Sequence, residues 1–225
     1  MELERFHTWT LTNKLVANTK KNFTMHFSRS RKFYFPMDFT LGNSEVLEEK
    51  KTMKILGLMV QSNLGWDSQI NQMVGRANKT TWALRRMKSL GVDTKTLVEY
   101  WKAEGRVHLE FACPVWHSSI TKAQRQSLER SQRVAMAAIV GFWEPSLTQQ
   151  LQVLGLDRLD VRRETISRRF ARSTATRSRH SDIFSLAPEA PERKAKHRLK
   201  YREPMARTAA YRKSAVPYLT RLLNQ

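Results

Sequence analysis

Few side chains in this sequence are suited to covalent or metal chemistry. Cys113 is the only cysteine, and His108 and His117 lie close enough in sequence to activate its thiol as a nucleophile. The six histidines lack the His-x-x-x-His spacing of a zinc site, and a single cysteine excludes disulfides and cysteine-based metal sites within the chain. An apolar helix before Cys113 and a proline after it are typical of a cysteine that is buried as a small hydrophobe. We therefore expect no nucleophile, no metal and no cofactor.

The net charge is the clearest chemical signal in the chain. Forty Lys and Arg stand against twenty Asp and Glu, which gives a formal charge of +20. Such an excess favours phosphate backbones or an anionic membrane surface as the partner. No apolar run reaches the roughly 18 residues of a membrane span, no helix is polarised enough for a membrane surface, and the start lacks a signal peptide. We predict a nucleic-acid partner, no small-molecule substrate, and a location in the cytoplasm or nucleus, neither secreted nor transmembrane.

The first 65 residues are predicted to form one helix and a small antiparallel sheet. Apolar residues recur at helical spacing over residues 2–15. Strand-like segments follow at 22–28, 36–41, 45–47 and 54–61, with a turn at 42–44 between the second and the third. A sheet of this size with one helix against it is too small for an independent core.

From Asp67 onward the pattern is helical. Apolar residues three and four apart predict a helix from Asp67 to Gly91, where glycine suits a left-handed C-terminal position. Asp93 is expected to cap a second helix that Pro114 ends. Three further helices have recognisable starts, namely the capping boxes Thr121/Gln124 and Ser146/Gln149, and a capping Asp157. The helical tryptophans are expected in the core, although one or two could flank a nucleic-acid duplex: Trp66, Trp82, Trp101, Trp116 and Trp143.

These patterns predict a mainly α fold with a small N-terminal β element (α+β). The predicted parts are a helix with a small sheet at 1–65, a helical bundle at 66–172 and a basic tail of low order at 173–225. Residues 158–225 alone hold eighteen Lys and Arg against six Asp and Glu. Tyr201 and Tyr211 interleave with this charge and could stack on the bases of a single strand. The alternative is a flexible, soluble tail without a site.

The motifs, taken in order, resemble the C-terminal part of reverse transcriptases from non-LTR (LINE-type, jockey-like) retrotransposons. Leu56-Gly57-Leu58, followed by Leu64, Trp66 and Ile70, is similar to the primer grip and the start of the thumb. Further similarities keep the family order from Trp9 to Asn224, among them Leu109-Glu-Phe-Ala112 with Val115-Trp116, Gln132-Arg133 with Gly141, Leu154-Gly-Leu-Asp-Arg-Leu159, and Pro217-Tyr-Leu-Thr-Arg-Leu-Leu-Asn224.

The resemblance implies a role for each part of the chain. Residues 1–65 would be the end of the palm, with Leu56, Gly57 and Leu58 against the primer end, and the helix from Asp67 would be a thumb helix along the template–primer hybrid. Lys21 takes the place of a lysine that protonates the leaving pyrophosphate; the alternative is a solvated lysine at the start of a strand. The resemblance and the charge together predict that the following cations contact phosphates: Lys79, Arg85, Arg86, Lys88, Arg162, Arg163, Arg168, Arg169, Lys194, Lys196, Arg198 and Lys200.

Polymerisation in this family needs two metal ions held by palm aspartates, including an Asp-Asp pair. This sequence contains no Asp-Asp pair. The resemblance therefore implies a truncated RNA-directed DNA polymerase segment that binds and positions the hybrid, is not an enzyme by itself, and leaves Mg²⁺ to the complete polymerase. The alternative is a free-standing basic helical RNA- or DNA-binding structural protein, which requires a self-contained core in the first sixty residues.

Overall fold

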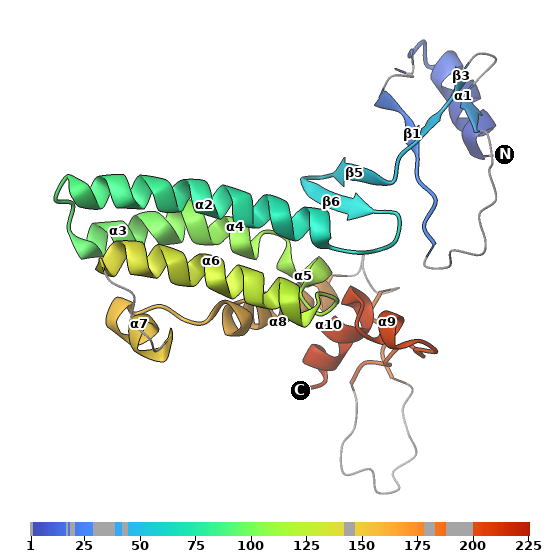
Figure 1. Ribbon diagram of the computed structural model, residues 1–225. Helices are drawn as coiled ribbons and strands as arrows, with labels where there is room; N and C mark the ends of the chain where they lie inside the picture. The colour runs from blue at the N-terminus through green and yellow to red at the C-terminus, as the bar shows by residue number, and fades with distance from the viewer. Residues whose placement is uncertain are drawn as a thin grey trace, which may run out of the picture. The chain divides into compact units, whose positions relative to one another are not determined.

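The computed structural model describes residues 2–16, 18, 21–28, 39–41, 45–141, 147–177, 183–187 and 200–225. The fold is mainly helical with small β elements, which confirms the predicted α+β class (Figure 1). The chain divides into two compact units, Met1–Gln69 and Ile70–Gln225. The predicted boundaries were at residues 65 and 172, whereas this division falls between Gln69 and Ile70.

The first unit contains one helix and short strand pairs. Helix α1 (Glu2–Thr12) confirms the predicted N-terminal helix. Two pairs of two-residue strands follow: a parallel pair of β1 (Phe23–Thr24) with β4 (Glu48–Glu49), and an antiparallel pair of β2 (Thr40–Leu41) with β3 (Glu45–Val46). The strand predicted at 22–28 is thus far shorter than expected. The turn predicted at 42–44 and the start of the strand predicted at 36–41 lie outside the described residues.

A β-hairpin closes the first unit. Strands β5 (Thr52–Ile55) and β6 (Leu58–Gln61) pair antiparallel, with Ile55 opposite Leu58. The two turn residues, Leu56 and Gly57, have φ angles of 47° and 91°, and positive φ at both positions is the requirement of a type I′ hairpin turn. The single strand predicted over 54–61 is therefore wrong. The apolar run concealed the turn because Leu56 is not a usual turn residue.

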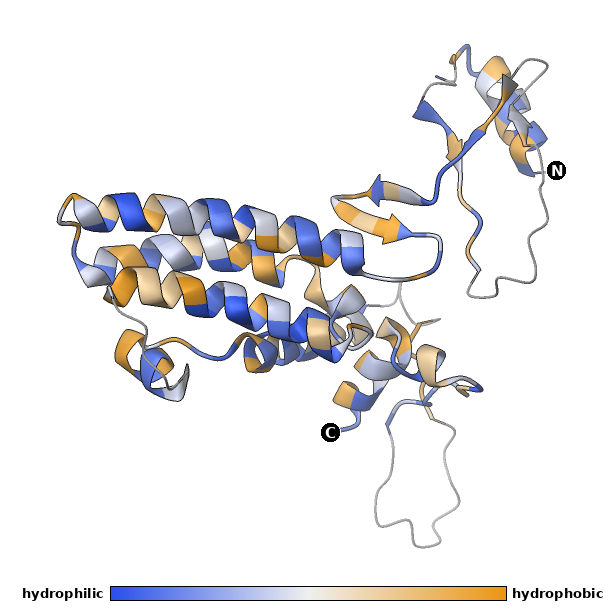
Figure 2. Ribbon diagram, viewed as in Figure 1, coloured by the Kyte–Doolittle hydropathy of each residue, from blue (hydrophilic) through white to orange (hydrophobic). Residues whose placement is uncertain are grey.

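The second unit consists mainly of helices, and Figure 1 labels its α-helices. Figure 2 shows hydrophilic and hydrophobic residues mixed along α2 and α6, as expected of helices that bury one side. Helix α2 begins at the end of the first unit. The elements are α2 (Asp67–Ser89), α3 (Thr94–Tyr100), the π-helix η2 (Trp101–Arg106), α4 (Val107–Glu110), α5 (Cys113–Trp116), α6 (Lys122–Val140), α7 (Leu147–Leu154), α8 (Leu159–Ala175), α9 (Ala209–Arg212) and α10 (Ala215–Leu223).

Several helix ends follow the predicted local chemistry. After α2 the Gly91 amide donates to the Lys88 carbonyl and the Val92 amide to the Met87 carbonyl, which together form a Schellman motif with Gly91 at φ 82°. The Asp93 carboxylate accepts from the Thr96 amide at 3.0 Å and caps α3. The predicted capping box at the start of α6 is present in both directions. The box predicted at Ser146 lies outside the described residues.

The long helix predicted from Asp93 to Pro114 is interrupted. A π-helical turn occupies Trp101–Arg106, and the Trp101 ring covers Gly105 so closely that an added Cβ would lie 2.1 Å from its Cε3 atom. The helix then ends at Glu110, where Ala112 adopts a left-handed φ of 50°. Pro114 stands in the first turn of α5, where a proline is tolerated, so the prediction that it ends the preceding helix is wrong.

The start of α8 is capped by a distant side chain. The amides of Leu159 and Asp160 donate to the Glu129 carboxylate on α6, at 3.4 and 2.9 Å. The cap predicted at Asp157 is therefore wrong, because α8 begins two residues later and takes its acceptor from another helix.

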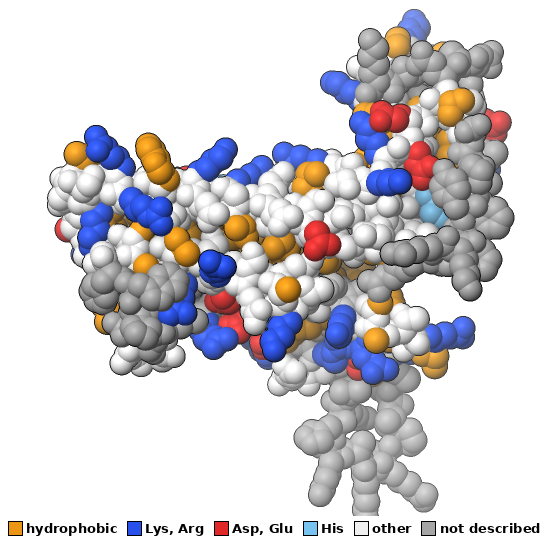
Figure 3. All heavy atoms as spheres, in the orientation of Figure 1, with side chains coloured by type: hydrophobic (Ala, Val, Ile, Leu, Met, Phe, Trp, Pro, Cys, Tyr) orange, Lys and Arg blue, Asp and Glu red, His pale blue; other side chains and the backbone are white. Residues whose placement is uncertain are grey.

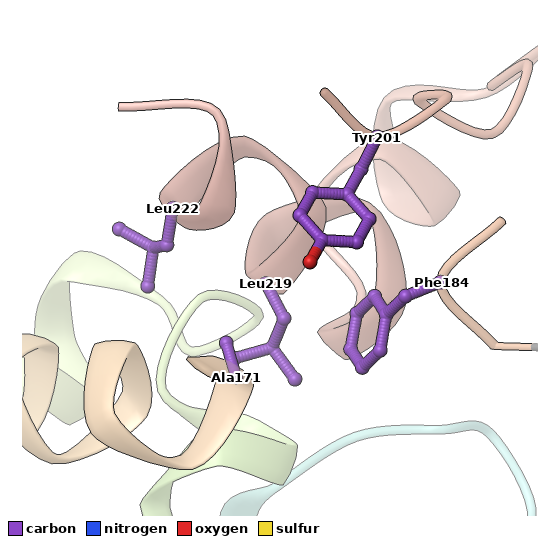
Figure 4. Close-up of a cluster of buried hydrophobic side chains, with 5 residues drawn as sticks. All are labelled: Ala171, Phe184, Tyr201, Leu219 and Leu222. Atoms are coloured by element: carbon purple, nitrogen blue, oxygen red, sulfur yellow. The ribbon is translucent and has the colours of Figure 1, made fainter. Parts of the chain in front are cut away.

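The C-terminal helices pack into the second unit. Helix α10 contacts α8 and α5. Figure 4 shows the buried cluster between them, and the described residues 200–225 are therefore not a tail of low order. Tyr201 is one of its members, so the prediction that its ring stacks on bases is wrong. The cluster consists of Ala171, Phe184, Tyr201, Leu219 and Leu222.

Candidate nucleic-acid interface

Helix α2 presents a basic side to solvent. It carries five Lys and Arg, and its one acidic residue, Asp67, lies in the first turn. Its buried residues recur at helical spacing and define the opposite side: Ile70, Met73, Ala77, Thr81 and Leu84. Figure 3 shows Lys and Arg side chains spread over the surface of the helices.

Trp82 lies in the middle of this exposed side. Its side chain is 69% exposed, although the sequence predicts a core position, so that prediction is wrong for Trp82. Lys79 precedes it by three residues and Arg86 follows it by four, and side chains at these spacings are neighbours on a helix. Lys79, Trp82, Arg85 and Arg86 are all exposed, and we call them the α2 basic face. An exposed indole between cations can stack on nucleic acid while the cations meet phosphates.

Lys88, the fifth cation of α2, has a structural role. Its Nζ donates to the Ile139 carbonyl and, at 3.0 Å, to the Val140 carbonyl at the end of α6. A cation at a helix C-terminus satisfies free carbonyls and complements the helix dipole. We therefore correct the prediction of a phosphate contact for Lys88, because its ammonium group joins α2 to α6.

Arg163 is fully buried. Its Nε donates to His117 Nδ1 at 3.3 Å, and its Nη2 lies 3.4 Å from a Glu129 oxygen. Burial lowers the pKa of the Arg163 guanidinium, and the Glu129 carboxylate opposes that shift. Burial, with the Arg163 charge, also lowers the pKa of His117 to about 4, so this imidazole is neutral at pH 7. The predicted phosphate contact of Arg163 is wrong.

The other predicted cations of α8 differ in whether they already bond to other side chains of the chain. Arg162 holds Glu110 with two hydrogen bonds of 2.6 and 3.2 Å, and Arg168 bonds to Glu164 and Gln225. Arg169 is exposed to solvent. Near the C-terminus Lys200 is exposed and lies 5.6 Å above the Tyr201 ring. Three of the predicted cations lie outside the described residues: Lys194, Lys196 and Arg198.

The predicted primer-grip residues meet at the hairpin tip of the first unit. Leu56 and Gly57 form the turn, Leu58 begins β6, and the Leu56 side chain is 95% exposed. The hairpin is fixed to the start of α2 by two hydrogen bonds: the Met59 amide donates to Gln69 Oε1 at 2.8 Å, and the Ser68 amide donates to Gln61 Oε1 at 3.0 Å.

Lys21 is exposed in the first unit. Within the described residues no cluster of three or more His, Cys, Asp or Glu could hold a metal ion.

Cys113 packs as a small hydrophobe, as predicted. It is fully buried, and its Sγ donates to the Arg163 carbonyl at 3.7 Å. Burial raises the pKa of the thiol to about 11, so the nucleophilic thiolate is not formed near neutral pH.

Helix α6 carries a set of exposed cations that was not predicted from the sequence. Lys122, Arg125 and Arg130 are exposed and line a hollow of about 1220 Å³ beside the start of α8. Their signal was available, because basic residues recur in the first three turns of α6.

No described helix is both long and apolar enough to cross a membrane. Comparisons with protein-family models, with curated proteins and with solved structures find no match to this chain.

Proposed function

We propose that this chain is a segment of a non-LTR retrotransposon reverse transcriptase that binds and positions the template–primer hybrid. The observation that carries the proposal is the exposed Trp82 between Lys79 and Arg86 on α2. A tryptophan left 69% exposed gains little from packing, and it is flanked by cations that attract phosphates. Contacts of this kind position a duplex without reading its sequence.

The hairpin tip supports the same proposal. Leu56 has a positive φ, which is strained for a residue with a Cβ, and its apolar side chain points into solvent. Strain of this kind accumulates at binding sites, where another molecule compensates for it. We propose that Leu56 packs against the primer end.

The chain does not carry the family's catalytic carboxylates, because its sequence contains no Asp-Asp pair. We propose that polymerisation and Mg²⁺ binding depend on residues outside this sequence, and that this segment does not polymerise alone. Its place of action would be the cytoplasm or nucleus, where the nucleic acid is.

Binding of a labelled RNA–DNA hybrid across a salt series tests the proposal. Lys79→Gln with Arg86→Gln should weaken binding on the order of tenfold and reduce the slope of log K against log salt by about 2, since each phosphate contact contributes roughly 0.9. Trp82→Ala should weaken binding without changing this slope. Lys95→Gln with Arg172→Gln is the matched control, because both residues are exposed and lie off the α2 basic face. A slope unchanged in the Lys79/Arg86 variant would contradict the proposal.

The alternative is a free-standing basic helical protein that binds RNA or DNA. The core of the second unit is compatible with it, because that unit buries large side chains within itself, including Trp101, Trp116 and Leu128. Hydrogen exchange on the full chain separates the two. The alternative requires residues 2–69 to be protected as strongly as the second unit, whereas the reverse-transcriptase proposal expects weak protection there.

A further inference from the structure

Three hollows lie along α6. A hollow of about 650 Å³ lies between the ends of α2 and α6, lined by Arg85, Lys88 and Gly141. A second, of about 420 Å³, shares Arg85 with the first and also reaches Arg130. The third, of about 1220 Å³, shares Arg130 with the second and extends to Lys213. We call these three neighbouring hollows together the α6 groove. Helix α6 has 19 residues and is therefore roughly 28 Å long.

The charge of the α6 groove is strongly positive. Its two acidic residues are already engaged. Glu129 caps α8 and pairs with Arg163, while Asp160 accepts from Arg158 at 3.0 and 2.8 Å. Lys88 also lines it, but its ammonium is bound to the α6 carbonyls. The other cations that line it are Arg85, Lys122, Arg125, Arg130, Arg133, Arg158 and Lys213.

The groove is built into the fold. Lys213, between α9 and α10, is held by its carbonyl, which accepts from the hydroxyls of Ser118 and Ser119 at 2.6 and 2.8 Å. Arg158 is held by its two bonds to Asp160. The cations of the third hollow therefore come from α6, the start of α8 and a fixed turn, and they converge on one concavity.

The shape and lining of the groove indicate its ligand. Small side chains leave room along it, among them Ala123, Ser127, Ser131, Ala137 and Ala138. A concave surface lined by cations suits one extended strand, whereas the α2 basic face is one side of a convex helix that can lie along a duplex. Basic grooves that follow the backbone are typical of proteins that bind single strands without sequence preference.

We propose that the α6 groove binds the phosphate backbone of a single-stranded nucleic acid, as a second site beside the α2 basic face. This inference goes beyond the proposed function, which concerns only the hybrid. None of the residues lining the three hollows is aromatic, so the affinity is electrostatic and independent of base identity.

The test measures fluorescence anisotropy of labelled oligo(dT), oligo(dC) and RNA–DNA hybrid with the full chain over a salt series. The groove variant carries Lys122→Gln, Arg125→Gln and Arg130→Gln, all at exposed positions. The matched control carries Lys95→Gln, Arg172→Gln and Arg207→Gln, which remove the same charge from exposed positions outside the groove. Arg85 stays unchanged because it belongs to both sites. Circular dichroism checks that each variant is folded.

We expect the groove variant to bind oligo(dT) and oligo(dC) on the order of tenfold more weakly than the control, with a salt slope smaller by about 2. Hybrid binding should change little. Single-strand affinity equal to the control, no single-strand binding by the wild type, or an equal loss for single strand and hybrid would each overturn the second site. A marked preference for one base would overturn its electrostatic character. The hybrid proposal fails separately, if the Lys79/Arg86 variant leaves hybrid binding unchanged.

Discussion

The two units differ in how far their apolar side chains are buried. In the second unit large apolar residues are fully buried among the helices, including Trp101, Trp116 and Leu128. Among the described residues of the first unit only Leu47 is a buried hydrophobic residue. Helix α1 instead exposes most of its apolar residues, and others in the unit are exposed as well: Phe6, Trp9, Leu11, Leu15, Val16, Phe27 and Val46.

This difference shows which unit has a hydrophobic core among its described residues. Burial of apolar surface is the main favourable term in folding, and among the described residues this burial is concentrated in the second unit. A set of exposed apolar side chains on a small unit marks a surface that other protein covers. Such a surface is what the reverse-transcriptase proposal requires, because the rest of a palm would supply the cover.

The largest expected effect is on stability, and it differs between the two units. Leu128→Ala removes a fully buried side chain from α6 and should lower the free energy of unfolding of the second unit by about 2–5 kcal/mol. Leu11→Ala makes the same change on α1, where the side chain is 63% exposed, and should cost less than about 0.5 kcal/mol. Urea unfolding followed by circular dichroism measures both. Equal losses would contradict the contrast between the units.

Acid should weaken the second unit through His117. Burial lowers its pKa in the folded state to about 4, below the ordinary value of 6.5. The fold thus favours the neutral imidazole. This preference contributes about 3 kcal/mol to the free energy of unfolding; the contribution is complete above about pH 6.5 and is lost as the pH falls toward 4. The raised pKa of Glu129, caused by burial, acts in the opposite direction.

Unfolding titrations at pH 7, 5.5 and 4 measure this loss, and His117→Gln isolates it. The variant should lose less stability between pH 7 and pH 4 than the wild type. A wild type and variant with parallel pH profiles would show that His117 does not carry the acid sensitivity.

Lys88→Met tests whether Lys88, the fifth cation of α2, has a structural role and makes no phosphate contact. Removing the ammonium leaves two α6 carbonyls without their donor, which should lower the free energy of unfolding by about 1 kcal/mol. The salt slope of hybrid binding should stay that of the wild type, unlike the slope of the Lys79/Arg86 variant. A reduced slope would show that Lys88 does contact phosphate, as first predicted.

The sequence predicted the features that depend on neighbouring residues. Gly91 ends α2 and Thr121 with Gln124 caps α6 because both signals act within one helical turn. The cap of α8 could not be predicted, since Glu129 lies thirty residues before Leu159 and reaches it only through the packing of α6 on α8. The same is true of Arg163, whose burial depends on His117 and Glu129 from other elements.

The candidate interface shows the same limit. Lys79 and Arg86 could be named from the helical pattern alone, but the exposure of Trp82 depends on which side of α2 the other helices cover. The π-helical turn, in which the Trp101 ring lies over Gly105, also escaped prediction. At the hairpin, an apolar run was interpreted as one strand because Leu at a left-handed turn position is rare.

That rarity gives the smallest and most specific prediction. Asparagine tolerates a left-handed conformation better than leucine, so Leu56→Asn should stabilise the hairpin by about 0.5–1 kcal/mol. Hydrogen exchange at the β5 and β6 amides measures the gain. If Leu56 packs against the primer end, the same variant should bind the hybrid several-fold more weakly, with no change in salt slope because no charge is altered. Stronger protection together with undiminished hybrid binding would mean that the strained leucine serves no contact with nucleic acid. The hairpin would then have to be removed from the proposed interface, while the α2 basic face would remain.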